Sequence, residues 1–244
     1  MNRLPYAISI FLILPSLVLA QADPEAAGES LSLWGMIRQG GWAMYPLGLC
    51  SLTMLFLFLH CWRETVKSRF VPGTGLELVE QSLAAGKIEE AVRRLSQLPT
   101  MLSRVMSKSL SRANVPFSDR NRNKVEATLV EALEGEENSI SQWINYLNVI
   151  AAVAPMIGLL GTVSGMIGAF QSISTSGMGR PELFAGNIGE ALITTATGLV
   201  IGIPSMIFFF VMRNRLNNAM LATVESANSL IDYLGGDLEA RSED

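Results

Sequence analysis

Charge is scarce in this sequence. Only 16% of its 244 residues are charged, whereas a soluble domain usually carries about 25%. The charged residues that do occur are concentrated in residues 63–145 and 213–244, which leaves long apolar blocks almost free of charge. With 49% hydrophobic residues, the chain is a poor fit to a soluble enzyme, a disordered chain or a disulfide scaffold. This distribution predicts a membrane protein.

Residue types that bind metals or form crosslinks are also scarce. The two cysteines, Cys50 and Cys61, would lie roughly 16 Å apart on one helix, beyond the reach of a disulfide. The single histidine, His60, has no partner placed to complete a metal site. The net charge of −4, with no basic tract, gives no support to nucleic-acid binding. We therefore expect no metal, no cofactor and no nucleic-acid partner.

Enzyme motifs are absent as well. The sequence has no glycine-rich phosphate-binding loop, so any energy source must be an ion gradient or a partner. Ser164 lies in the segment Gly161–Gly165, which departs from the G-x-S-x-G motif, and His60 belongs to the opposite end of a span. We expect that the chain is not an enzyme.

The N-terminus resembles a secretory signal peptide. Arg3 precedes an apolar stretch over residues 4–19, and Ala20-Gln21-Ala22 supplies a small-residue cleavage pattern. The stretch is short for a membrane span, which needs about 20 apolar residues. We predict that residues 1–22 are removed and that residues 23–41 form a periplasmic segment. The alternative is an uncleaved additional span.

Three further blocks are long enough to cross a bilayer. The first covers residues 42–62 and is bracketed by aromatic residues of the kind that lie at membrane interfaces. The second covers residues 146–173 and the third covers residues 187–212. A short loop rich in glycine and serine, residues 174–186, joins the second span to the third.

Basic residues near the span ends predict the orientation. Most of them lie on one side of the predicted membrane: Arg63, Lys67, Arg69, Arg213 and Arg215. The positive-inside rule therefore places residues 63–145 and the C-terminal residues 213–244 in the cytoplasm, with the 174–186 loop outside. A cleaved signal peptide predicts the same orientation, with a periplasmic mature N-terminus.

The polar regions are predicted to be helical. Apolar residues recur at helical spacing through residues 76–95, and Ser118 is a suitable N-cap for a long helix that continues into the second span. The C-terminal helix is predicted to end at Gly235-Gly236. No β-sheet is required. The expected fold is all-α, with three spans extended by cytoplasmic helices.

The second and third spans hold the candidate functional residues. Small residues and prolines suited to close helix packing recur in both: Pro155, Gly158, Gly161, Gly165, Gly198, Gly202 and Pro204. Thr162 and Thr195 fall at similar depths on antiparallel spans, which predicts a polar belt facing an internal cavity. Glu190, the one charged residue within the spans, is interpreted either as an ion relay or as an interfacial carboxylate. Thr194 and Thr197 share its helix face and line either the ion path or a subunit boundary.

Two motifs resemble the ExbB/TolQ branch of the MotA/TolQ/ExbB proton-channel family. They are APMIGLLGTV at residues 154–163 and GEALITTATGL at residues 189–199. The resemblance implies a homopentameric helical bundle around a central pore that encloses an ExbD-like dimer. It also implies that proton-motive force across the bacterial inner membrane energises TonB-dependent transport through a TonB-like partner. The family's pore threonines map onto Thr162 and Thr195, and its membrane glutamate maps onto Glu190.

Several alternatives remain open at the level of sequence. The additional hydroxyls of Thr194 and Thr197 leave Na⁺ as an alternative to H⁺. A TolQ-like role in envelope maintenance differs only in the partner, and a MotA-like flagellar stator would keep residues 4–19 as a fourth span. A membrane scaffold that conducts no ions is the alternative from a different class.

Overall fold

The computed structural model describes residues 40–72, 75–112, 119–176 and 181–241. The predicted signal peptide, residues 1–22, lies outside the described residues. In the described part of the chain every regular element is a helix: α3 (Met44–Glu64), α4 (Lys67–Phe70), α5 (Leu76–Ala84), α6 (Ile88–Ser96), α7 (Met101–Leu110), α8 (Asp119–Ser176) and α9 (Pro181–Arg241). The prediction of an all-α fold is confirmed.

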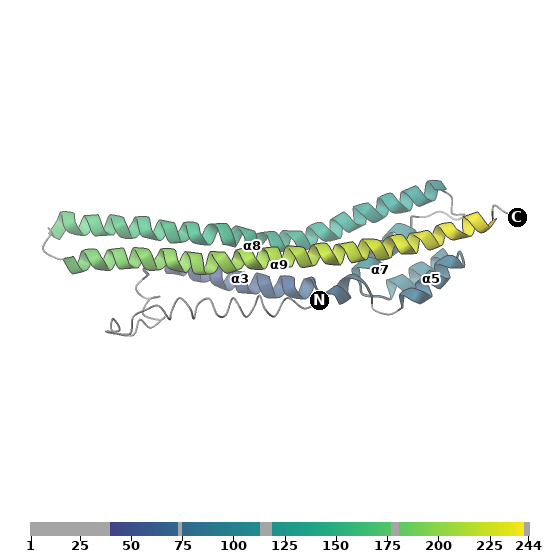
Figure 1. The fold of residues 1–244 in the computed structure, drawn as a ribbon, viewed down its shortest axis with the longest axis horizontal. Coiled ribbons are helices and arrows are strands. Elements are labelled where there is room, and N and C mark those ends of the chain that lie inside the picture. Colours follow the sequence, from purple (N-terminus) through teal and green to yellow (C-terminus); the bar gives the residue numbers. More distant parts are fainter. Residues whose placement is uncertain (1–39, 73–74, 113–118, 177–180, 242–244) are drawn as a thin grey trace.

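Two very long antiparallel helices form the axis of the molecule. Helices α8 and α9 have 58 and 61 residues, and they lie side by side over nearly their whole length (Figure 1). Each is about 90 Å long at a rise of about 1.5 Å per residue, three times the roughly 30 Å of a bilayer core. The helices therefore do not end where the predicted spans end. The boundaries of those spans, at residues 146–173 and 187–212, stay predictions.

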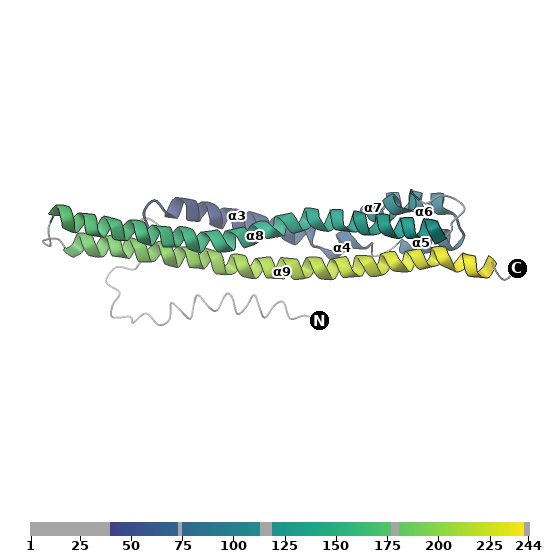
Figure 2. The same cartoon turned by 90° about the horizontal axis from the view of Figure 1, so that it is seen from above.

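Three helices are long and apolar enough to cross a membrane: α3 itself, residues Arg122–Thr175 of α8 and residues Phe184–Tyr233 of α9. Helix α3 packs against both long helices and runs toward the middle of the molecule, and α8 and α9 extend beyond its N-terminal end (Figure 2). Many large apolar side chains of these helices are exposed, among them Leu49, Leu52, Phe56, Leu160, Phe170, Leu192 and Val200. A soluble chain would bury such side chains, so their exposure is typical of a surface that meets lipid or other subunits.

The C-terminal helix is longer than the sequence predicts. The expected end at Gly235-Gly236 is wrong, because α9 continues through both glycines to Arg241. A glycine inside a helix costs only about 1 kcal/mol relative to alanine. A helix that is already nucleated and packed over its preceding turns can tolerate that cost.

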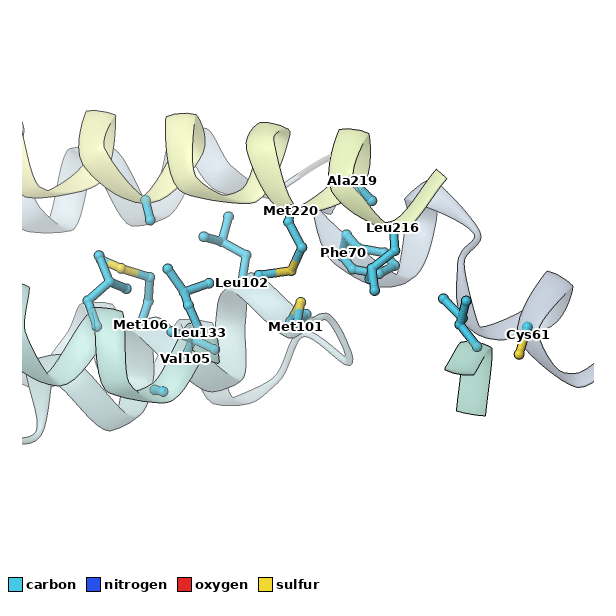
Figure 3. Close-up of a cluster of buried hydrophobic side chains, with 14 of the residues drawn as sticks. Cys61, Phe70, Met101, Leu102, Val105, Met106, Leu133, Leu216, Ala219 and Met220 are labelled. Carbon is cyan, nitrogen blue, oxygen red and sulfur yellow. The ribbon is translucent and has the colours of Figure 1, made fainter. Parts of the chain in front are cut away.

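The short helices α4–α7 pack beside the other halves of α8 and α9. Their turns use glycines with positive φ at Gly75 (φ 95°) and Gly86 (φ 69°), and Thr100 caps α7 by accepting a bond from the Ser103 amide. Figure 3 shows the buried cluster they form with the long helices, including Phe70, Met101, Leu102, Met106, Leu133, Leu216 and Met220. This core fixes α4–α7 to the long helices.

Candidate functional site

Helices α8 and α9 approach each other most closely along a line of small residues, here called the α8–α9 seam: Gly158, Gly161 and Gly165 of α8, and Ala191, Thr194, Gly198 and Gly202 of α9. A Cβ on Gly158 would lie 2.9 Å from the Thr194 carbonyl oxygen and 3.1 Å from the Thr195 Cα. A Cβ on Gly198 would lie 2.7 Å from the Ala154 carbonyl oxygen. The obstacles are backbone atoms, which cannot rotate away. The two backbones reach this distance only because side chains are absent.

The two prolines of the spans lie inside continuous helices. Pro155 lacks an amide hydrogen, so the Ala151 carbonyl loses its usual partner four residues later. Gly202 covers that carbonyl, since a Cβ on Gly202 would lie 3.1 Å from the Ala151 oxygen and 2.7 Å from the Pro155 ring. Beside Pro204, the buried Ser205 hydroxyl donates to the Ile201 carbonyl at 2.8 Å. Helix α8 stays continuous through Pro155, and α9 stays continuous through Pro204.

Two neighbouring threonines of α9 share one acceptor on α8. The Thr195 hydroxyl donates to the Gly158 carbonyl oxygen at 3.1 Å, and the Thr194 hydroxyl lies 3.5 Å from the same oxygen. Thr194 also donates to the Ala191 carbonyl at 2.8 Å and is only 1% exposed. Thr194 therefore lies inside the seam of a single chain, whereas Thr195 is half-buried at its edge.

The other two candidate threonines bond to their own helices. Thr162 donates to the Leu159 carbonyl at 2.6 Å, and Thr197 donates to the Ile193 carbonyl at 2.8 Å. Both side chains are half-buried. In the seam, Gly161 lies opposite Thr194, and Gly158 lies opposite Thr195. At a rise of about 1.5 Å per residue, these pairings put Thr162 and Thr195 at depths that differ by only about 3 Å. Two hydroxyls are thus held at nearly one level of the helix pair.

Glu190 lies against the turn that precedes α3. A Cβ placed on Gly41 would coincide with the Glu190 carboxylate. The Glu190 side chain is half-buried next to this backbone turn. No sequence pattern indicates this contact with Gly41. The sequence also does not indicate a second contact of this turn, in which the Trp42 indole nitrogen donates a hydrogen bond to the Ser164 hydroxyl at 3.1 Å.

The threonine hydroxyls of this site offer hydrogen bonds. Among the described residues, no group of three or more His, Cys, Asp or Glu side chains could hold a metal ion. Threonine hydroxyls can donate and accept hydrogen bonds, so they can order water or a partner's polar group without carrying charge. The assignment of Thr162, Thr194, Thr195, Thr197 and Glu190 to an ion path stays a prediction.

Comparison with known proteins identifies relatives of this chain. Residues 97–225 match the MotA/TolQ/ExbB proton channel family. Biopolymer transport protein ExbB of Xanthomonas campestris pv. campestris (strain B100) is 36% identical over 129 residues, which are 52% of this chain and 47% of that protein. Putative biopolymer transport protein ExbB-like 1 of Synechocystis sp. is 32% identical over 211 residues, 83% of this chain and 79% of that protein. Tol-Pal system protein TolQ of Haemophilus influenzae is 35% identical over 101 residues, which are 41% of this chain and 42% of that protein.

The coverage of these matches differs. The chain spans about half the length of the Xanthomonas relative but most of the Synechocystis relative. The family match takes in α7, α8 and most of α9, and thus the whole seam with its hydroxyls. Together with three apolar helices long enough to cross a bilayer, it identifies this chain as a membrane protein of the MotA/TolQ/ExbB proton channel family.

Proposed function

We propose that this chain is the ExbB-like subunit of a proton-driven motor in the bacterial inner membrane. Five copies would enclose an ExbD-like dimer, and the assembly would use proton-motive force to energise TonB-dependent transport across the outer membrane. Relatives named ExbB support this class of function. The distribution of basic residues supports a periplasmic mature N-terminus and a cytoplasmic C-terminus.

The observation that carries the proposal is the pair of half-buried hydroxyls, Thr162 and Thr195, at nearly one level of α8 and α9. A hydroxyl can pass a hydrogen bond but does not titrate near neutral pH. The predicted spans contain one carboxylate, Glu190, and it lies against Gly41. The titrating acid must then come from another subunit, and the ExbD-like partner would supply it.

The energy is sufficient for mechanical work. One proton that moves through about 100 mV releases about 2.3 kcal/mol, so a few protons drive a substantial conformational change. In this proposal the chain contributes an uncharged, smooth surface on which the partner's acid can exchange its proton and move. The transported ion is H⁺, and Na⁺ is the alternative that the flux measurement can distinguish.

The test is proton flux in liposomes that contain the chain together with its ExbD-like partner. We expect the double variant T162V/T195V to slow acidification by about tenfold while leaving the oligomer assembled, because valine preserves shape and removes both hydroxyls. The matched control is T53V on α3, where an exposed hydroxyl likewise bonds its own helix, to the Leu49 carbonyl at 2.8 Å. Equal flux above the background of empty liposomes would contradict the assignment of the two threonines, and flux at background in both proteins would support a non-conducting scaffold instead.

A TolQ-like role is the second candidate, and the TolQ relative of Haemophilus influenzae favours it. Both roles use the same ion path, so mutation of the seam does not separate them. Affinity purification from the native membrane separates them by the identity of the partner: a TonB-like protein supports the first role, and a Tol-type protein supports the second.

A further inference from the structure

The turn that leads into α3 has a backbone that only glycine adopts easily. Gly41 has φ of 59°, in the left-handed region. A larger residue at position 41 would also clash sterically, because a Cβ on Gly41 would coincide with the Glu190 carboxylate. The Glu190 side chain therefore occupies the volume that a side chain at position 41 would take.

The residues on either side of Gly41 also touch the long helices. A Cβ on Gly40 would lie 3.5 Å from the Ile193 side chain of α9. The Trp42 indole nitrogen donates to the Ser164 hydroxyl of α8 at 3.1 Å. The turn thus contacts both α8 and α9. We call these six residues the α3 clasp: Gly40, Gly41, Trp42, Ser164, Glu190 and Ile193.

Helix α3 lacks a cap of its own at this end. Its N-cap residue is Ala43, which makes no side-chain capping bond, and its first turn has no acidic residue. The first amides of a helix carry partial positive charge, which a nearby carboxylate stabilises. Glu190 supplies a carboxylate beside this end from a different helix.

We propose that Glu190 is a positioning residue that holds the N-terminal end of α3 on the α8–α9 pair. It acts by filling the space beside Gly41 and by placing a carboxylate near the first turn of α3. In this role Glu190 does not relay ions, which is one of the two interpretations that the sequence allows. The contact itself is independent of the proposed motor, and only the flux measurement below rests on the proposed function.

The direct test is amide hydrogen exchange of residues 42–47, measured by mass spectrometry on the full chain in lipid nanodiscs. We expect E190A to speed exchange of these amides by about tenfold, because the start of α3 loses the side chain that packs beside Gly41 and the carboxylate near its first turn. The conservative variant E190Q keeps the size and shape of the side chain beside Gly41 and should restore slow exchange. Unchanged exchange in E190A would overturn the proposal.

Matched controls separate the clasp from general destabilisation. E182A removes an exposed carboxylate from the first turn of the same helix and should leave the exchange of residues 42–47 unchanged. G41A should reproduce the effect of E190A. G48A, at a glycine of α3 where an added Cβ would meet no atom within 4 Å, should not. Equal effects of G41A and G48A would contradict the role of the Gly41 contact.

Proton flux with the ExbD-like partner distinguishes positioning from ion relay. A positioning residue predicts that E190Q conducts like the wild type while E190A conducts poorly. If Glu190 relays ions, E190Q should lose proton flux while the amide exchange of residues 42–47 stays unchanged. That result would overturn the proposal. If the wild type conducts no protons at all, the proposed function fails, and the exchange experiment still decides whether the clasp exists.

Discussion

At the scale of single residues, the seam shows how a glycine determines what its neighbours can do. Gly158 lets α9 approach until the Thr195 hydroxyl reaches the Gly158 carbonyl at 3.1 Å. A side chain at position 158 would separate the helices and break this bond. The same residue type thus sets both the packing and the placement of the candidate pore hydroxyl.

The first prediction concerns Gly158 and a control on the same helix. G158A should destabilise the folded chain by about 1–3 kcal/mol, because its Cβ meets backbone atoms that cannot rotate away. G135A, where nothing lies within 4 Å, should stabilise the chain by about 0.5–1 kcal/mol through its helix propensity. Thermal unfolding in detergent measures both. Similar shifts in both variants would contradict the close approach at Gly158.

At the scale of elements, ion pairs link the short helices and the ends of the long ones. Arg104 of α7 makes a two-bond pair with Glu136 of α8, at 3.1 and 2.8 Å, and this pair raises the pKa of the Arg104 guanidinium. Arg122 of α8 bonds both Glu126 and, at 3.1 Å, Asp232 of α9. These pairs are well exposed, so each contributes at most about 1 kcal/mol.

The second prediction concerns the pH dependence of α6. The hydrogen bond from Arg94, together with its charge, lowers the pKa of Glu90. A lowered carboxyl pKa contributes stability that is present above the ordinary glutamate pKa and is lost as the pH falls through the lowered value. E90Q should therefore melt slightly below the wild type at pH 7, and this difference should disappear in acid. A difference that grows as the pH falls would contradict the assignment.

At the scale of the whole molecule, a single chain leaves extensive apolar surface uncovered. Beyond the predicted spans, a groove of about 500 Å³ lies between α8 and α9. It is lined by Leu129, Val130, Leu133, Glu134, Glu137, Asn217, Met220, Leu221, Val224 and Asn228. Val130 and Leu221 are 54% and 61% exposed there, in a region that the predicted orientation places in the cytoplasm rather than in lipid. In the proposed homopentamer, a neighbouring copy covers this groove.

The third prediction tests whether a neighbouring copy covers this groove. L221K places a charge in the groove and should reduce the mass of the solubilised oligomer, because burying an unpaired charge in an apolar contact is unfavourable. S229K adds the same charge at an exposed position of α9 outside the groove and should leave the mass unchanged. Light scattering after size exclusion measures both. An intact oligomer in L221K would show that the groove lies outside the subunit contact.

The sequence by itself determined the class of protein and most of its helices. Charge-free blocks of membrane length can only be helical in lipid, so the three apolar helices followed from hydropathy alone. The glycine and threonine motifs likewise indicated the family and two tightly packed helices, since small residues at a spacing of four lie on one helix face. These properties depend on local composition and periodicity.

Only the tertiary structure decided which helix each polar side chain contacts. Helical spacing placed Thr194 and Glu190 on one face, yet Thr194 is buried against Gly161 of α8 and Glu190 lies against Gly41 at the start of α3. The positions of Gly41 and Glu190 are 149 residues apart in the chain, a separation across which periodicity carries no information. Periodicity describes one helix at a time, whereas these contacts depend on how three helices pack together.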